Sequence, residues 1–323
     1  MKKILSIAVA LITIIAVAGG VIVYIDWQAN FIPIYWEDMP PNSNENLKYF
    51  GYYHFSDDRI EEVASFGHSN MCKVDGDDTQ ELMRLIDNGF FVFVMIRHMF
   101  FSSGGTPDNW QEKWEAVKAT IDPYIDRILG FYVDEPIKYD LTTGENVGKS
   151  MESFHFACNT VRADYPDKKM MAVLTVNDLS KKEYSREYYK YCTDLGYDFY
   201  PKWNKKSVLK FISTLEDSIA VDNQDIWLIP KGFYTVDVKA DDLYWLIEPR
   251  DLPPGEDVLD WIKGSYEIAV ADSRIVGIFC FVYDNDNFTI PLRKFFLPDS
   301  EHYNEEVYGV YNQIGHAVIA NCK

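Results

Sequence analysis

Cysteine, histidine and basic residues are scarce in this sequence, and each shortage excludes a class of function. The five cysteines form no Cys-x-x-Cys pair, and none of the six histidines has metal-ligand spacing, so we expect no metal site and no cofactor. The 31 basic residues face 50 acidic ones, and the net charge of −19 repels nucleic acid and anionic headgroups. No Gly-rich phosphate fingerprint follows the first predicted strand. Neutral substrates remain compatible with this composition.

The N-terminal segment, residues 1–25, differs from the rest of the chain. Residues 4–25 carry no charge and would form a helix of roughly 33 Å at ~1.5 Å per residue, which predicts a transmembrane anchor that contacts the lipid bilayer. A cleaved signal peptide is the alternative, since Ala16-Val17-Ala18 offers small residues. Lysines before the segment and Asp26 after it predict that the remainder lies outside the cytoplasm, membrane-anchored or secreted. We interpret residues 26–46 as a tether and residues 47–323 as one domain.

Short apolar runs alternate with amphipathic stretches throughout this domain. Eight strands and eight helices over this length predict an α/β fold, a single-domain (β/α)₈ TIM barrel, with a doubly wound open sheet as the alternative. The predicted strands are 49–55, 70–74, 90–96, 129–133, 170–176, 197–200, 226–229 and 275–282. The predicted helices are 57–65, 78–87, 108–124, 145–165, 182–195, 206–220, 258–271 and 304–320.

The fourth predicted strand ends on two adjacent carboxylates. Residues 128–133 are apolar and rich in β-favouring side chains, and Asp134, Glu135 and Pro136 follow directly. Two acids at the end of a buried strand are costly unless they are paired, hydrogen-bonded or solvated in a cleft. A catalytic or binding role is therefore the leading interpretation. The alternative is an acidic pair that caps a helix.

In a barrel, the residues that close the strands share one mouth. Acids, amides and aromatic rings there suit sugar recognition, because hydroxyls need acceptors and donors while pyranose faces stack on rings. Each of these residues also has a structural alternative as a core cap, a salt bridge or a solvent-exposed group. The predicted substrate-binding residues are His54, Arg97, His98, Tyr200, Trp203, Lys231, Tyr234 and Tyr283.

The strand ending Val133-Asp134-Glu135-Pro136 resembles that of the (β/α)₈ glycoside hydrolase superfamily, whose largest clan ends its fourth strand in Asn-Glu-Pro. The resemblance implies that Glu135 is the general acid/base. Residues 198–201 are similar to the Asp-x-Tyr-Pro ending of such barrels. One departure concerns the seventh strand, which carries a nucleophilic Glu in that clan. Here Lys231 follows the strand and no carboxylate does, so membership of that clan and its retaining mechanism do not carry over.

Glycoside hydrolysis generally needs two carboxyl groups. With Glu135 as proton donor and Asp134 as its charged neighbour or brace, we rank Asp284 first and Asp178 next as the second carboxylate. Retaining and inverting mechanisms both stay open. The predicted function is hydrolysis of an extracytoplasmic oligo- or polysaccharide. The alternatives are a surface-tethered carbohydrate-binding barrel without catalysis and, more remotely, a metal-dependent phosphodiesterase.

Overall fold

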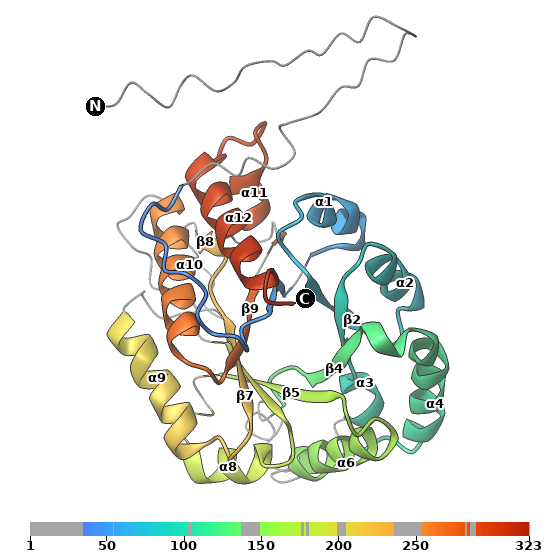
Figure 1. Ribbon diagram of the computed structural model, residues 1–323. Helices are drawn as coiled ribbons and strands as arrows, with labels where there is room; N and C mark the ends of the chain where they lie inside the picture. The colour runs from blue at the N-terminus through green and yellow to red at the C-terminus, as the bar shows by residue number, and fades with distance from the viewer. Residues whose placement is uncertain are drawn as a thin grey trace, which may run out of the picture. The chain divides into compact units, whose positions relative to one another are not determined.

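Eight parallel strands close into a barrel, with helices around them (Figure 1). The computed structural model describes residues 35–53, 55–101, 105–136, 149–175, 178, 181–198, 205–235, 254–281, 283–284 and 289–322. The barrel strands, in spatial order, are β1 (Tyr49–Tyr52), β2 (Met71–Asp75), β3 (Phe91–Met95), β4 (Ile128–Val133), β5 (Lys169–Leu174), β6 (Asp194–Asp198), β7 (Asp225–Ile229) and β9 (Ile275–Cys280). The predicted TIM barrel is confirmed, and the open sheet is wrong because β1 pairs with β9.

The helices alternate with these strands, as the sequence predicted. Two further helices, α3 and α11, and an antiparallel pair of short strands, β8 and β10, were not predicted. Their bounds are β8 (Phe233–Thr235) and β10 (Thr289–Pro291). The helices are η2 (Asp57–Arg59), α1 (Ile60–Ser65), α2 (Thr79–Asp87), α3 (Arg97–Phe100), α4 (Trp110–Ile121), η3 (Asp122–Arg127), α6 (Lys149–Asp164), α8 (Lys182–Tyr189), α9 (Lys205–Ser218), α10 (Pro254–Ala271), α11 (Leu292–Phe296) and α12 (Glu305–Ile319).

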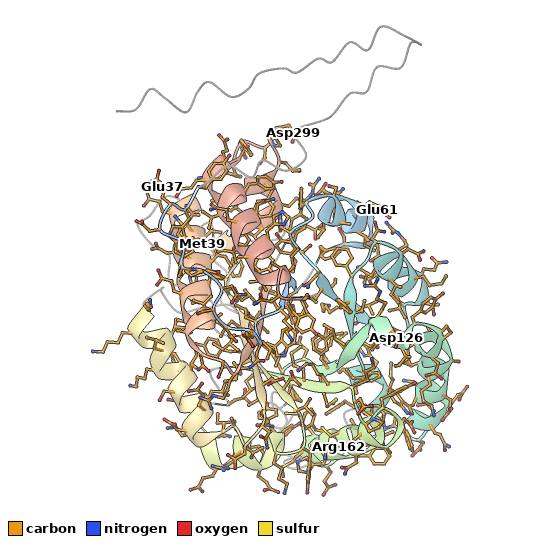
Figure 2. All side chains as sticks on the ribbon, viewed as in Figure 1. Glu37, Met39, Glu61, Asp126, Arg162 and Asp299 are labelled. Carbon is orange, nitrogen blue, oxygen red and sulfur yellow. The ribbon has the colours of Figure 1, made fainter. Side chains whose placement is uncertain are left out.

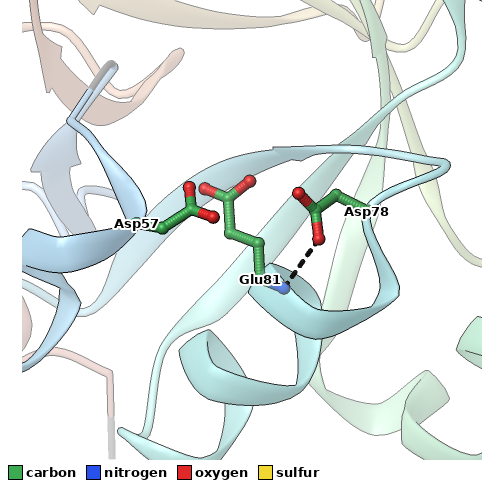
Figure 3. Close-up of side chains that lie close together, drawn as sticks. All are labelled: Asp57, Asp78 and Glu81. Carbon is green, nitrogen blue, oxygen red and sulfur yellow. Dashed lines mark hydrogen bonds between the residues drawn. The ribbon is translucent and has the colours of Figure 1, made fainter.

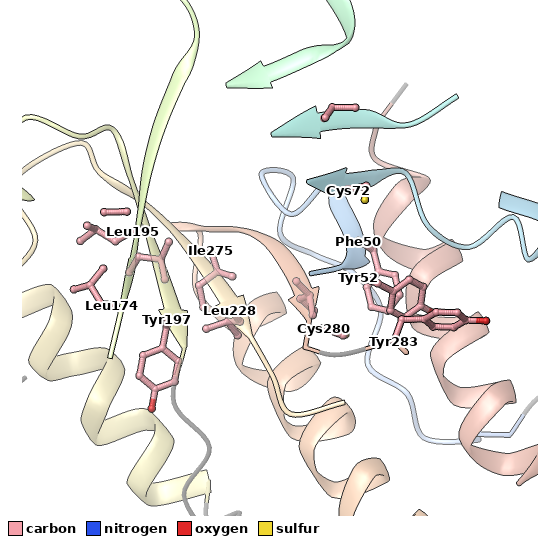
Figure 4. Packing of buried hydrophobic residues seen from close by; sticks show 14 of the residues in the cluster. Phe50, Tyr52, Cys72, Leu174, Leu195, Tyr197, Leu228, Ile275, Cys280 and Tyr283 are labelled. Atoms are coloured by element: carbon pink, nitrogen blue, oxygen red, sulfur yellow. The ribbon is translucent and has the colours of Figure 1, made fainter. Parts of the chain in front are cut away.

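Alternating side chains of the strands build two separate cores. Outward-facing residues such as Phe50, Leu195 and Leu228 pack under the helices (Figure 4), while Phe93 and Met171 are among the residues that fill the barrel interior. Strands covered on both faces are therefore apolar on both faces, as the sequence showed. Charged side chains lie on the outside of the helix ring, as Glu61 and Arg162 do in Figure 2.

The lower end of the barrel, where the strands begin, is closed by an aromatic and ionic floor. The Trp227 ring stacks on Tyr49 with centroids 5.4 Å apart and meets the edge of Phe93 at 5.1 Å. A Cβ on Gly277 would lie 2.2 Å from the Trp227 ring, so only glycine fits there. Beside the ring, Asp194 accepts a hydrogen bond from Trp227 Nε1 at 2.7 Å.

Strand β6 begins at Asp194, earlier than the sequence predicted, because the charge of this buried carboxylate is paired with a lysine. Asp194 is fully buried, yet Lys169 Nζ lies 2.7 Å from its Oδ1 and Thr193 Oγ1 donates to its Oδ2. In the sequence, an acid followed by Leu and Gly is typical of a turn. The lysine that pairs with this acid lies on the neighbouring strand β5, and the sequence alone does not place the two together.

The described part of the predicted tether packs on the barrel. The backbone N–H groups of Tyr35 and Trp36 donate to Gln313 Oε1 on α12 at 2.8 and 2.9 Å. The buried Asn44 amide reaches the carbonyls of Ala269 and Ile275 at 2.8 and 2.9 Å. Residues 35–46 thus fold with the barrel. The predicted anchor, residues 1–25, lies outside the described residues, and none of the helices that are described is long and apolar enough to cross a membrane.

Candidate active site

The candidate site is the mouth, the end of the barrel where the parallel strands finish. The second, fourth and sixth strands each bring an acid to it. Asp75 and Asp198 are the last residues of β2 and β6, and Asp134 follows β4. In each strand the preceding residue packs in the outer core, so these three carboxylates share the inward face. Alternate strands supply one layer of a TIM barrel interior, which puts the three acids in a common layer.

Asp134 is held by a tyrosine from the first strand. Tyr53 Oη donates to Asp134 Oδ1 at 2.6 Å, and the Tyr53 ring packs against Phe279 inside the barrel. Burial, followed by the negative charge of Asp134, raises the pKa of the Tyr53 phenol well above its usual value, so it stays a donor. Lys73 Nζ lies 5.6 Å from the centre of the same ring and brings a positive charge to this layer.

A second buried phenol lies next to this pair and senses the same acids. Tyr132 of β4 meets the Tyr53 ring edge-on at a centroid distance of 6.1 Å. Burial first, and then the charges of Asp134 and Asp75, raise the pKa of Tyr132 well above its usual value. The Oδ1 atom of Asp75 is buried and has no hydrogen-bond partner among the described residues. The mouth thus combines two phenol groups with three acids.

Glu135 has a backbone conformation that glutamate rarely adopts. Its φ is +41°, in the left-handed region, and it is one of two non-glycine residues with positive φ in the described chain. This conformation costs on the order of 1–2 kcal/mol for an L-residue with a Cβ. Strain of this kind persists only where the surrounding structure imposes it, and it concentrates at functional sites. Glu135 is partly exposed, so solvent reaches this residue.

The two acids ranked as second carboxylate have other partners. Asp178 is fully buried and accepts hydrogen bonds from Thr175 N at 2.8 Å and from Tyr189 Oη at 2.5 Å. Burial raises its pKa to about 6. A sugar in solution does not reach this carboxyl in the described arrangement. Asp284 accepts from the Ser56 backbone N–H at 2.9 Å and from the Ser56 hydroxyl, which ties it to the loop after β1.

Two of the predicted substrate-binding residues, Lys231 and Tyr283, are buried. Lys231 Nζ forms an ion pair of 2.7 Å with Asp257 Oδ2, and the two side chains are 5% and 1% exposed. Tyr283 is fully buried and donates to Glu62 Oε1 at 2.7 Å. A buried ion pair and a buried phenol that packs against Phe296 of α11 are structural contacts, so neither side chain is presented to a sugar.

The remaining predicted binding residues are exposed or undescribed. Arg97 and His98 open α3 directly after β3, Arg97 half-buried and His98 exposed, so both stay accessible. Tyr234 belongs to β8, outside the barrel, and its side chain is not among those described. His54, Tyr200 and Trp203 lie outside the described residues.

A separate acidic cluster lies beside the mouth at the start of α2 (Figure 3). Oxygen atoms of Asp57, Asp78 and Glu81 all lie within 4.8 Å of one another. Asp78 caps the helix by accepting from Glu81 N at 2.9 Å. Burial and the two neighbouring acids raise the pKa of Glu81 to about 8. A cation would relieve this repulsion, but helix capping already accounts for the position of Asp78.

Sequence analysis places Asp75 at the predicted mouth, but Tyr53, Asp75 and Asp198 are not among the predicted catalytic or substrate-binding residues, although each ends or follows a strand. Tyr53 reads as one more aromatic in the run 49–55, and only the closed barrel places it against Asp134. For Asp75 and Asp198 the signal was available. Counting in steps of two from the apolar Met71 gives the inward face of β2, and Asp75 lies on it.

Solved structures with a similar fold include glycoside hydrolases. An endo-1,4-beta-xylanase from Caldicellulosiruptor owensensis is 13% identical with a TM-score of 0.53, and the match covers 84% of this chain and 99% of the xylanase chain. A beta-glucuronidase from Ruminococcus gnavus, in complex with D-glucuronic acid, is 11% identical with a TM-score of 0.52, and the match covers 83% of this chain and 48% of the glucuronidase chain. No family model and no curated protein sequence matches this chain. The chain therefore has the closed eight-stranded (β/α)₈ barrel found in the glycoside hydrolase superfamily.

Proposed function

We propose that this barrel hydrolyses glycosidic bonds and that Glu135 is the proton donor. The observation that carries the proposal is the strained, left-handed Glu135 directly after the fourth strand, at the mouth of a barrel shared with glycoside hydrolases. Glu135 protonates the glycosidic oxygen as the bond to the anomeric carbon breaks. The partner of this site is an oligo- or polysaccharide, and no cofactor takes part.

The second carboxyl group of the reaction comes from the same inward-facing layer. Asp134 is occupied by Tyr53, which leaves Asp75 and Asp198 on the two flanking even-numbered strands. The acids around this mouth disfavour an anionic sugar, so we propose a neutral saccharide. We also propose that the apolar residues 4–25 direct the barrel outside the cytoplasm, attached to the bilayer if the segment is retained.

The test is a comparison of the full-length protein with its Glu135→Gln variant on a panel of neutral and acidic polysaccharides. Released reducing ends report hydrolysis, and calorimetry reports binding. Release by the wild type from a neutral polysaccharide, with loss in the variant, supports the proposal. Binding without release identifies a carbohydrate-binding barrel instead, which the absence of an acid after β7 would favour. Neither binding nor release on any saccharide contradicts both.

A further inference from the structure

The peptide that follows Glu135 is fixed by a buried hydroxyl. The carbonyl oxygen of Pro136 accepts a hydrogen bond of 3.0 Å from Ser150 Oγ, in the first turn of α6. Ser150 is 8% exposed, so water does not replace this bond. Residues 137–148 lie between the two partners in sequence, and the contact joins the end of β4 to the start of the helix that follows. The turn that contains the strained φ of Glu135 therefore has a direct support.

A tyrosine on the next helix orients that hydroxyl. Ser150 Oγ also forms a short hydrogen bond with Tyr188 Oη of α8, and Tyr188 is fully buried. Ser150 has a single hydroxyl proton, and it goes to the Pro136 carbonyl, so Tyr188 is the donor to Ser150. The Tyr188 ring packs against Phe154 at a centroid distance of 5.4 Å and cannot turn away. Hydrogen bonds are thus donated from Tyr188 to Ser150 and from Ser150 to the carbonyl of Pro136.

The adjacent tyrosine supports the end of the neighbouring strand in the same way. Tyr189 Oη donates to Asp178, and Asp178 accepts from the backbone and side chain of Thr175, directly after β5. Two consecutive tyrosines of α8 therefore brace the ends of β4 and β5 from behind the barrel wall. This gives the buried Asp178 a structural role and explains why it lies away from the mouth.

We propose that Ser150 and Tyr188 are positioning residues that hold Glu135 in its left-handed conformation and so place its carboxyl for proton transfer. The inference rests on the proposed function, because it names the residues that hold the proposed proton donor in place. Proton transfer requires the donor within hydrogen-bond reach of the leaving oxygen, so a small displacement of Glu135 is costly. Without Ser150, the turn loses its tie to α6 and the backbone at Glu135 relaxes toward an unstrained conformation.

The test uses Ser150→Ala and Tyr188→Phe, with Ser153→Ala as a matched control. Ser153 is also a buried serine of α6, at 2% exposure, but its partner is Thr106 Oγ1, from which it accepts at 3.0 Å, and not the Pro136 carbonyl. Each variant is assayed on a saccharide with a poor leaving group and on an aryl glycoside with an activated one. We expect Ser150→Ala to lower kcat on the saccharide about tenfold with little change in KM, and to lower it less on the aryl glycoside, which needs less protonation. Ser150→Thr, which keeps the hydroxyl, should recover most of the loss.

Equal losses on both substrates, or the same loss in Ser153→Ala, would overturn the inference, because a general loss of folding does not discriminate between leaving groups. A crystal structure of Ser150→Ala gives a second readout that does not depend on turnover. A φ of Glu135 outside the left-handed region supports the inference, while an unchanged φ contradicts it. If the wild type is inactive on every substrate, the proposed function fails, and the φ comparison still decides whether Ser150 holds the turn.

Discussion

The two ends of this barrel use the same kinds of residue in opposite ways. At the floor, Lys169 lies between Asp194 and Asp225, with Nζ 2.7 Å from an oxygen of each, and Trp227 donates to Asp194. At the mouth, Asp75, Asp134 and Asp198 share one inward-facing layer, and Lys73 lies on the same face of β2, with Nζ 5.6 Å from the centre of the Tyr53 ring. Acids, a lysine and aromatic rings occur at both ends. The difference lies in the partners that are described: a lysine pairs with two carboxylates at the floor, while Asp134 at the mouth accepts from a neutral phenol.

The partners of the charged side chains decide what each end contributes. Burial alone would lower the pKa of Lys169, but the two flanking carboxylates outweigh it and raise this pKa, so the floor stays an ion network. At the mouth, Glu135 is strained, and the buried Oδ1 of Asp75 has no hydrogen-bond partner among the described residues; both features cost stability. In TIM barrels the lower end generally serves stability and the upper end chemistry, and the proposed function assigns the same division to this chain.

The largest expected effect comes from breaking the floor. Lys169→Met leaves Asp194 fully buried without its counter-charge, so the free energy of unfolding should fall by roughly 3–5 kcal/mol. Urea unfolding measures this change. Hydrolysis far below the melting temperature should stay at the wild-type rate, because the floor lies at the opposite end from Glu135.

Lys190→Met is the matched control for that variant. Lys190 pairs with Glu187 three residues away on the surface, with side chains 32% and 54% exposed. Its loss should leave the free energy of unfolding close to the wild-type value, because solvent screens an exposed ion pair. Equal losses in the two variants would show that the floor network is no more stabilising than a surface pair.

Compared with Lys169→Met, Tyr53→Phe at the mouth should have a smaller effect on stability and a larger effect on activity. The ring remains in place, while Asp134 loses its donor and is free to rehydrate, so the free energy of unfolding should fall by about 1 kcal/mol. Saccharide hydrolysis should fall about tenfold, because Asp134 is the backbone neighbour of Glu135. Steady-state kinetics and thermal unfolding measure the two quantities.

Tyr165→Phe provides the comparison for the mouth variant. Tyr165 Oη donates to Asp122 at 2.5 Å on the outside of the barrel, so the same type of bond is lost far from the mouth. A fall in turnover as large as that of Tyr53→Phe would contradict a special role for the mouth pair.

The smallest expected effect concerns the acidic cluster beside the mouth. The pKa of Glu81 is raised from 4.5 to about 8 in the folded state, so the folded state favours the protonated carboxyl. The contribution of Glu81 to the free energy of unfolding is therefore fully present below pH 4.5 and is lost as pH rises through 8. Glu81→Gln should remove this loss, which solvent screening limits to roughly 0.5–1 kcal/mol. Urea unfolding at pH 5 and pH 8 measures it. Glu112→Gln, an exposed acid in the first turn of α4, should leave the pH dependence as in the wild type.

The sequence predicted the barrel and the end of β4 because both depend on local patterns. An apolar run that stops at Asp134 and Glu135 needs no knowledge of distant residues. Asp178 and Asp284 also follow strands, but their directions are set by Tyr189 and Ser56, which the sequence does not place beside them. Tyr53 was missed for the same reason. Contacts between side chains that lie on different elements decided each of these cases.

The most direct test of the central proposal is the rate of Glu135→Gln on two substrates of the wild type, a saccharide with a poor leaving group and an activated aryl glycoside. A proton donor contributes about 10²- to 10⁴-fold, so the saccharide rate should fall by that factor. The aryl glycoside rate should fall much less, with the melting temperature unchanged. A saccharide rate within about twofold of the wild type, or equal losses on both substrates, would contradict the assignment of Glu135 as proton donor.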